Sequence, residues 1–431
     1  MKLAIFNQLI GFDYRSNWLH IRCLLPSNLT KHLYPMSIHL LFLSFIRCRL
    51  AILLFLCFSC SSDSGSDRNK AYIAQELRSG GKNIRIPLDG ETSHYSLGLG
   101  YNKTETPLLF NFNPIKKSIQ VYDLQKQQLS RELVFEEEGS EGIGRLNGFH
   151  VHNLDSIFVF TSVPSTMFLT DLEQSYLFRI VLDIPEGYVG PEFRPAPFNA
   201  NPIIRGDKML AKVVVPARIP DIEESQLSQQ FLSAEFSLGD GNGSFSAHKY
   251  PVGYLEKGLK APYFSMAASP NRVVVYSFFA DHQLHVAEEA SMKTKTVAAK
   301  SRYLPQDFPT LSRTAVQLEY MTYLFTSPRY EGLLYDTFRE VYYRFCFPSI
   351  EIREQEEINQ LRAYPKDFSV MILDKNLTIL GETRFKNKHL VPNNVFVAED
   401  GLYISTNHPD NPILEEDWME FELFELVEVG G

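Results

Sequence analysis

Short apolar runs separated by turn residues dominate the chain from Asn83 onward. This pattern is typical of an all-β protein. One unit recurs: an apolar strand runs into an acidic residue, a short polar turn follows, and a second strand leaves. The six units begin with residues 119–123, 167–171, 234–240, 284–288, 368–374 and 419–425. The second strands of the first five are residues 129–135, 176–182, 244–249, 293–299 and 377–385.

A further strand precedes each unit, at residues 108–113, 156–161, 209–215, 272–278, 341–347 and 401–406. Units spaced by roughly 60 residues favour a six-bladed β-propeller over a sandwich, because propeller blades repeat four strands around a channel. The spacing exceeds the usual ~40–50 residues of such repeats, so we expect long loops. Weak helical periodicity predicts small helical insertions at residues 222–231 and 351–362.

The last unit has almost no chain left for a second strand, whereas residues 83–88 form an isolated strand near the other end. We expect this strand to pair beside residues 421–427 and complete the last blade. Such closure removes two exposed sheet edges, which otherwise promote aggregation.

An apolar run of nine residues, 50–58, follows Arg47 and Arg49 and leads into Ser59 and Cys60. It is too short for a membrane-spanning helix, which needs about 20 apolar residues. Its length suits the apolar region of a secretory signal. We interpret the segment as a lipoprotein signal peptide that is cleaved before Cys60, where the chain is lipidated. The alternatives are an ordinary cleaved signal and a longer spanning helix that would bury both arginines.

These features divide the chain into four parts. Residues 1–35 are expected to be untranslated or unstructured, because Met36 offers a start nearer the signal. Residues 36–59 are the signal peptide, residues 60–82 a lipid-anchored leash and residues 83–431 the propeller domain. The expected location is the cell envelope, with a lipid anchor in the outer membrane. The sequence does not decide between the periplasmic face and the surface face of that membrane.

Charge narrows the range of partners. The whole chain carries a formal charge of −9, and the six basic and one acidic side chains before Cys60 leave −14 for the remainder. Nucleic acid is therefore not an expected partner, because its binders carry basic patches. Cys346 is the only cysteine after Cys60, so the exported part has no internal disulfide.

Three segments carry a resemblance to a known family. They are residues 332–345, with G-L-L-Y-D and V-Y-Y-R-F, residues 141–159, with E-G-I-G and D-S-I-F-V, and residues 368–382. The sequence resembles the six-bladed β-propeller lipoproteins of Bacteroidota grouped as domain of unknown function 4221. The resemblance implies the fold and an envelope location, and it supplies no activity and no catalytic residue.

Ligands of propellers bind where the innermost strands converge. The segments expected there carry candidate ligand-binding residues, which are His150, His152, Tyr263, Arg329, Tyr330 and Asn393, with Asn201 and Asn394 beside them. The two histidines alternate on one strand and share a side, so they suit a metal, an acid–base pair or simple hydrogen bonding in the wall. We expect a small polar ligand or glycan fragment near His152 and Arg329.

Other motifs point to structure rather than chemistry. Four glycines at positions 139, 142, 144 and 148 lack the lysine and helix of a phosphate-binding loop. The acids of residues 415–428 alternate with apolar residues, as on the solvated face of a strand. Cys346 is expected to be a small buried residue. No catalytic residue, cofactor or metal is predicted.

Three functions remain open. The first is a membrane-anchored envelope lipoprotein whose propeller binds a ligand or partner protein without catalysis. The second is a hydrolase or lyase acting on a polar or glycan-derived substrate in the channel. The third is a structural component of an outer-membrane assembly.

Overall fold

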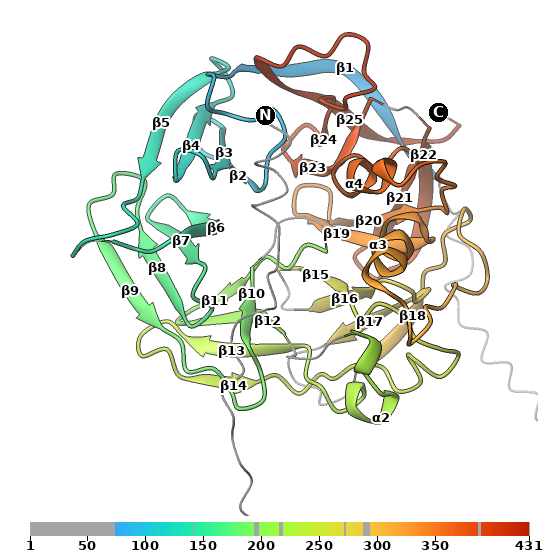
Figure 1. Cartoon of the computed structure of the whole chain (residues 1–431). Helices are drawn as coiled ribbons and strands as arrows, with labels where there is room; N and C mark the ends of the chain where they lie inside the picture. The colour runs from blue at the N-terminus through green and yellow to red at the C-terminus, as the bar shows by residue number, and fades with distance from the viewer. Residues whose placement is uncertain are drawn as a thin grey trace, which may run out of the picture. The chain divides into compact units, whose positions relative to one another are not determined.

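The computed structural model describes residues 74–430 except 141, 194–197, 215–218, 271–272, 288–293 and 387–388. In this part of the chain the strands form six separate sheets. The sheets follow one another in chain order around a ring (Figure 1). The six-bladed β-propeller expected from the sequence is therefore confirmed. Cys60 and the predicted signal peptide lie outside the described residues.

In the first three sheets the chain runs from the inner strands outward (Figure 1). The first contains β2 (Leu99–Asn102), β3 (Leu108–Asn113), β4 (Ser118–Asp123) and β5 (Gln128–Val134). The second contains β6 (Leu146–Asn153), β7 (Ser156–Thr161), β8 (Thr166–Thr170) and β9 (Leu177–Val181). The third contains β10 (Gly190–Glu192), β11 (Ile203–Arg205), β12 (Lys208–Val214), β13 (Ser233–Ser237) and β14 (Gly243–Phe245), with β10 and β11 both paired to β12.

The other three sheets follow the same order. The fourth contains β15 (Phe264–Ala268), β16 (Val274–Phe278), β17 (Gln283–Ala287) and β18 (Lys295–Ala298). The fifth contains β19 (Arg329–Asp336), β20 (Val341–Phe347), β21 (Phe368–Asp374) and β22 (Ile379–Phe385). The sixth contains β23 (Val391–Val397), β24 (Leu402–Ser405), β25 (Trp418–Glu428) and β1 (Gln75–Pro87).

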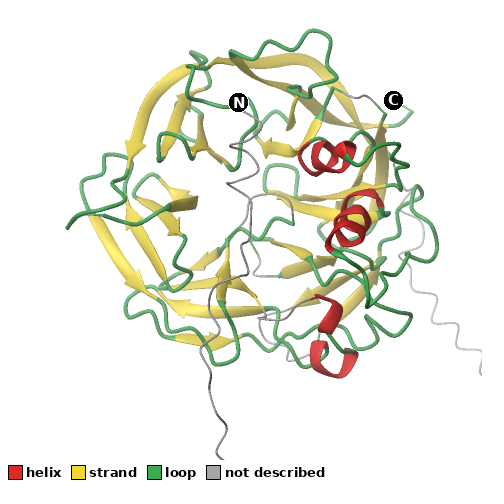
Figure 2. Ribbon diagram, in the orientation of Figure 1, coloured by secondary structure: helices red, strands yellow, loops and turns green. Residues whose placement is uncertain are grey.

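The helices of the described residues are short insertions between strands (Figure 2). The helix expected at 222–231 is a single turn, α2 (Glu224–Leu227), preceded by the 3-10 turn η1 (Ile219–Asp221). The helix expected at 351–362 is α4 (Glu356–Ala363), whereas α3 (Gln317–Thr326) has no counterpart in the sequence analysis. None of the described helices is both long and apolar enough to cross a membrane.

Strand β1 pairs antiparallel with β25 and is the outermost strand of the sixth sheet. Ile84 lies opposite Phe421, and the pairing continues to Gln75 opposite Glu428. The strand thus begins eight residues before Asn83, so the expected leash boundary at residue 82 is wrong. Residues 75–79 pair with β25, which offers them a hydrogen-bonding edge, and Leu77 is buried there; the register then shifts before the pairing resumes at Asn83.

The core consists of apolar layers between neighbouring sheets. Strand β20 shows how they arise: Tyr343 and Phe345 pack toward the sixth sheet, whereas Tyr342 and Cys346 pack toward the fourth. Successive side chains of a strand point to opposite faces, and both faces of each blade are covered. The middle strands therefore have nearly continuous apolar sequences, and Cys346 is a buried free thiol, as predicted.

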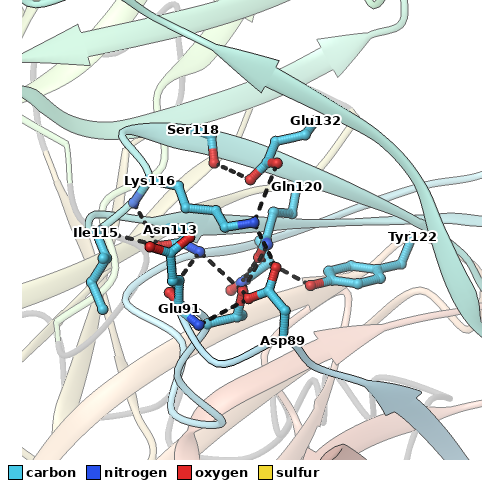
Figure 3. Close-up of polar contacts among 11 residues, drawn as sticks. Asp89, Glu91, Asn113, Ile115, Lys116, Ser118, Gln120, Tyr122 and Glu132 are labelled. Atoms are coloured by element: carbon cyan, nitrogen blue, oxygen red, sulfur yellow. Dashed lines mark hydrogen bonds and ion pairs between the residues drawn. The ribbon is translucent and has the colours of Figure 1, made fainter. Parts of the chain in front are cut away.

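A polar cluster fixes the segment after β1 onto the first sheet (Figure 3). The Lys116 Nζ atom lies 2.5 Å from Asp89 Oδ2 and lowers the pKa of that carboxyl group. Gln120 donates from Nε2 to Thr92 Oγ1 at 2.8 Å and accepts a hydrogen bond from the Tyr122 hydroxyl at 3.0 Å. These side chains satisfy one another, so we assign the cluster to chain closure rather than to ligand binding.

Candidate functional site

Two hollows lie between the inner strands. The first halves of β19 and β23 and the beginning of β2 line a cavity of about 60 Å³, which we call the axial chamber. The ends of the same three strands, with the end of β6, line a hollow of about 360 Å³, which we call the turn-side basin. The basin reaches the size of ordinary ligand pockets, about 300–1,000 Å³, whereas the chamber does not.

Aromatic rings form one wall of the turn-side basin. Tyr101 on β2 stacks on Phe396, with ring centroids 5.8 Å apart. Phe338, in the turn after β19, meets the Tyr101 ring edge-on at 6.5 Å and keeps 38% of its surface exposed. Tyr335 packs on Tyr342 with centroids 4.7 Å apart. Rings that are fixed on one side and open on the other present rigid apolar faces to a ligand.

Polar groups surround these rings. Lys103 forms an ion pair with Glu399, and its Nζ atom lies 5.7 Å from the centroid of the Phe338 ring. His152 and Asn102 also line the basin. Burial, and then the nearby Glu399, raises the pKa of Tyr101, which keeps that phenol protonated at neutral pH. Because Glu399 balances Lys103, the basin offers hydrogen-bonding groups with little net charge.

The axial chamber contains a carboxylate whose charge is balanced. Glu331 is 5% exposed, and its Oε2 atom accepts a hydrogen bond from Arg329 Nε at 2.6 Å. Arg329 also donates to the carbonyl groups of Phe325 and Ser327, at the end of α3. Arg329 therefore secures the end of α3 against β19 and has little capacity left for an anion.

The chamber also contains an amide that lacks a full set of partners. Asn393 on β23 is 9% exposed, and its Nδ2 atom has no hydrogen-bond partner among the described residues. Burial raises the pKa of the nearby Tyr95, and the Asn393 amide acts to lower it. The neighbouring Asn199 is bound instead to the backbone of Leu333, by its Oδ1 atom at 2.8 Å and its Nδ2 atom at 2.6 Å. Asn393 thus remains available to a guest.

The structure divides the candidate residues instead of gathering them. His152 lines the basin, whereas Asn393 and Asn201 line the chamber. His150 is half-buried beside Phe158, and burial, followed by His152, lowers the pKa of its imidazole to about 4. The expectation of one site containing His152 and Arg329 needs correction. His152 lies near the end of its inner strand and Arg329 at the beginning of another.

Three further candidates make contacts within the propeller. The Tyr330 ring is fully buried between the fourth and fifth sheets, and its hydroxyl group bonds to His282 Nδ1 at 2.8 Å. The Tyr263 hydroxyl bonds to the Tyr320 hydroxyl on α3 at 2.7 Å. Asn394 binds the backbone of Ser96 with both polar atoms of its amide, each at 2.8 Å. Neither tyrosine lines either hollow.

The sequence analysis missed Glu331, Tyr101 and Phe338 as site residues. Glu331 follows Arg329 at a spacing of two, which places both side chains on one side of a strand. That spacing is the signal that would have found the pair. Tyr101 and Phe338 carry no comparable signal, because aromatic residues are frequent throughout the chain. The described residues contain no group of three or more His, Cys, Asp or Glu side chains that could hold a metal ion.

Comparison with known proteins identifies the family. The model of the family described as domain of unknown function DUF4221 matches residues 82–384, which is more than half of the chain. The chain belongs to the DUF4221 family. This confirms the resemblance found in the sequence.

The crystal structure of a DUF4221 member from Bacteroides vulgatus is similar, with 25% identity, a TM-score of 0.74, and coverage of 83% of this chain and 99% of that chain. A predicted exported protein from Bacteroides fragilis has 10% identity and a TM-score of 0.48, with coverage of 82% and 95%. No curated protein matches the sequence.

Proposed function

We propose that this DUF4221 protein is a lipid-anchored envelope protein whose propeller binds a glycan in the turn-side basin without catalysis. The observation that carries the proposal is the pairing of Tyr101 with the exposed Phe338 over a basin of about 360 Å³. Apolar faces of sugar rings pack on such aromatic faces, while hydroxyl groups bond to the polar rim.

The charge of the basin favours a neutral or weakly charged glycan. Lys103 is paired with Glu399, so neither a strongly anionic nor a strongly cationic ligand gains a free counter-ion there. His152 is the histidine among the residues that line the basin. Acid–base chemistry on a glycosidic bond uses two carboxyl groups, so the described lining favours binding over hydrolysis.

The location rests on the sequence of the signal segment. A short basic stretch, an apolar run and Cys60 give the chain a lipid attachment point. Two or more acyl chains at such a cysteine anchor a protein stably. The described part of the chain begins 14 residues after Cys60, at Ala74.

The test is glycan binding by the full chain in detergent. A panel of neutral and acidic oligosaccharides would be screened, and the strongest binder titrated by calorimetry. Phe338→Ala should weaken binding about three- to tenfold, because an aromatic face of this kind contributes roughly 0.5–1.5 kcal/mol. Phe178→Ala is the matched control, since Phe178 is 51% exposed on the outer strand β9. Equal affinities of the two variants, or release of shortened products, would refute the proposal.

A further inference from the structure

The axial chamber is a second hollow with its own chemistry, and the proposed glycan site does not use it. It is formed by the beginnings of inner strands, whereas the basin is formed by their ends. Its volume of about 60 Å³ exceeds the ~10–15 Å³ that one water molecule requires. The chamber can therefore hold a group of several non-hydrogen atoms.

Two polar atoms in the chamber have opposite hydrogen-bonding character. Glu331 is a buried carboxylate acceptor that lines the chamber, and Asn393 Nδ2 is a donor without a hydrogen-bond partner among the described residues. Asn393 is more than nine-tenths buried, so an empty donor there costs free energy. A hydroxyl group donates to a carboxylate and accepts from an amide, and therefore satisfies both atoms.

Charge and shape restrict the guest further. Arg329 balances Glu331 at 2.6 Å, so the chamber gives no advantage to a free cation or anion. Phe198, Phe345 and Phe347 supply apolar wall, which suits the carbon atoms of the guest. Phe198 has a backbone φ of 55°, an uncommon conformation for a bulky residue that is maintained at a cost and is frequent at ligand sites.

We propose that the axial chamber binds the hydroxyl-bearing end of a neutral polyol. The carbon chain packs on the phenylalanine rings, one hydroxyl group bridges Glu331 and Asn393, and the exposed Asn201 bonds a second hydroxyl group at the opening. The polyol is free or forms the open-chain end of a longer glycan. Both sources present the same diol to the chamber.

Ligand-observed saturation-transfer NMR on the full chain in detergent tests this inference, with erythritol as the probe. Acetate and methylammonium are charged probes of smaller size, and maltotriitol presents the same diol on a glycan. Erythritol should receive saturation and the two ions should not. Transfer to maltotriitol but not to erythritol would assign the chamber to a glycan end if Asn393→Leu abolishes it, whereas transfer that persists in Asn393→Leu and is lost in Phe338→Ala would belong to the basin and overturn the proposal. Preferential binding of either ion, or transfer to no probe, would overturn the proposal and leave ordered water as the occupant.

Variants locate the signal. Asn393→Leu should weaken erythritol binding about three- to tenfold, the loss expected for one neutral hydrogen bond in a buried site. Asn376→Leu, which removes an exposed amide in the turn after β21 and outside both hollows, should leave it unchanged. If Asn393→Leu fails to fold, Asn201→Leu at the exposed opening gives the same reading with a smaller loss. Unchanged binding in Asn201→Leu and in folded Asn393→Leu would refute the site, while Phe338→Ala reports separately on the basin.

Discussion

Arg344 connects the fourth and fifth sheets from a fully buried position, and Arg344→Met should destabilise the propeller strongly. Its Nε atom donates to Ser277 Oγ at 2.9 Å, and its two Nη atoms donate to the carbonyl oxygens of Asp281 and Ala299, each at 2.7 Å. The guanidinium carbon also lies 3.3 Å from the centroid of the Tyr330 ring. Methionine fills the space but donates no hydrogen bond.

The magnitude follows from the groups that the substitution leaves behind. Arg344 donates to the carbonyl oxygens of Asp281 and Ala299, and both lose this donor in the variant. A buried polar group without a partner costs about 1–3 kcal/mol, which gives about 2–6 kcal/mol for the two. Relief from burying the arginine charge offsets part of this cost. We expect a net loss of about 3 kcal/mol from the 5–15 kcal/mol that is typical of a folded domain.

Urea denaturation followed by circular dichroism measures this loss as a lower midpoint. Arg78→Met is the matched control, because the Arg78 side chain is 57% exposed and bonds only to Glu76 on its own strand. Its free energy of unfolding should stay within about 0.5 kcal/mol of the parent value, so its midpoint should hardly change. Arg344→Lys should fall between the two, since lysine keeps the charge but not the planar fork of donors. Equal midpoints for Arg344→Met and Arg78→Met would refute the reasoning.

Three further predictions concern closure, pH and anchoring. Deleting residues 1–88 removes β1 and exposes the apolar surface that Ile84 and Ile86 cover, so the chain should aggregate. Deleting residues 61–70 should leave the melting midpoint unchanged. Equal tolerance of the two deletions in thermal melts would contradict closure of the ring by β1. The pKa of His150 is lowered from 6.5 to about 4, so the unfolded chain binds a proton at this imidazole before the folded chain does. The free energy of unfolding should therefore fall by at most about 3 kcal/mol as the pH drops from 6.5 to 4. His150→Phe should flatten this part of the curve of stability against pH, and an unaltered slope would count against the prediction. Cys60→Ala should release the protein from membranes after a high-salt wash, and retention in the membrane fraction would place the anchor elsewhere.

The sequence alone predicted the middle strands of the blades and the family. In β20 and β21 alternate side chains enter two different apolar layers, so both strands have continuous apolar sequences bounded by turns. Each such strand can be predicted without knowledge of its partners, because burial on both faces requires an apolar residue at almost every position. The isolated strand at residues 83–88 could also be assigned, because the last blade, at the other end of the chain, lacked its outermost strand.

Only the tertiary structure decided which polar residues meet. Residues 75–82 resemble a leash in composition and become a strand because β25 lies beside them. Glu331 and Asn393 belong to different blades, and they share a chamber only because β19 and β23 both line the same cavity. The sequence suggested that Arg329 could bind a ligand, whereas in the structure it donates to two carbonyl groups at the end of α3. Strand periodicity is a local property of the chain, whereas the partners of a buried polar group come from residues far away in the sequence.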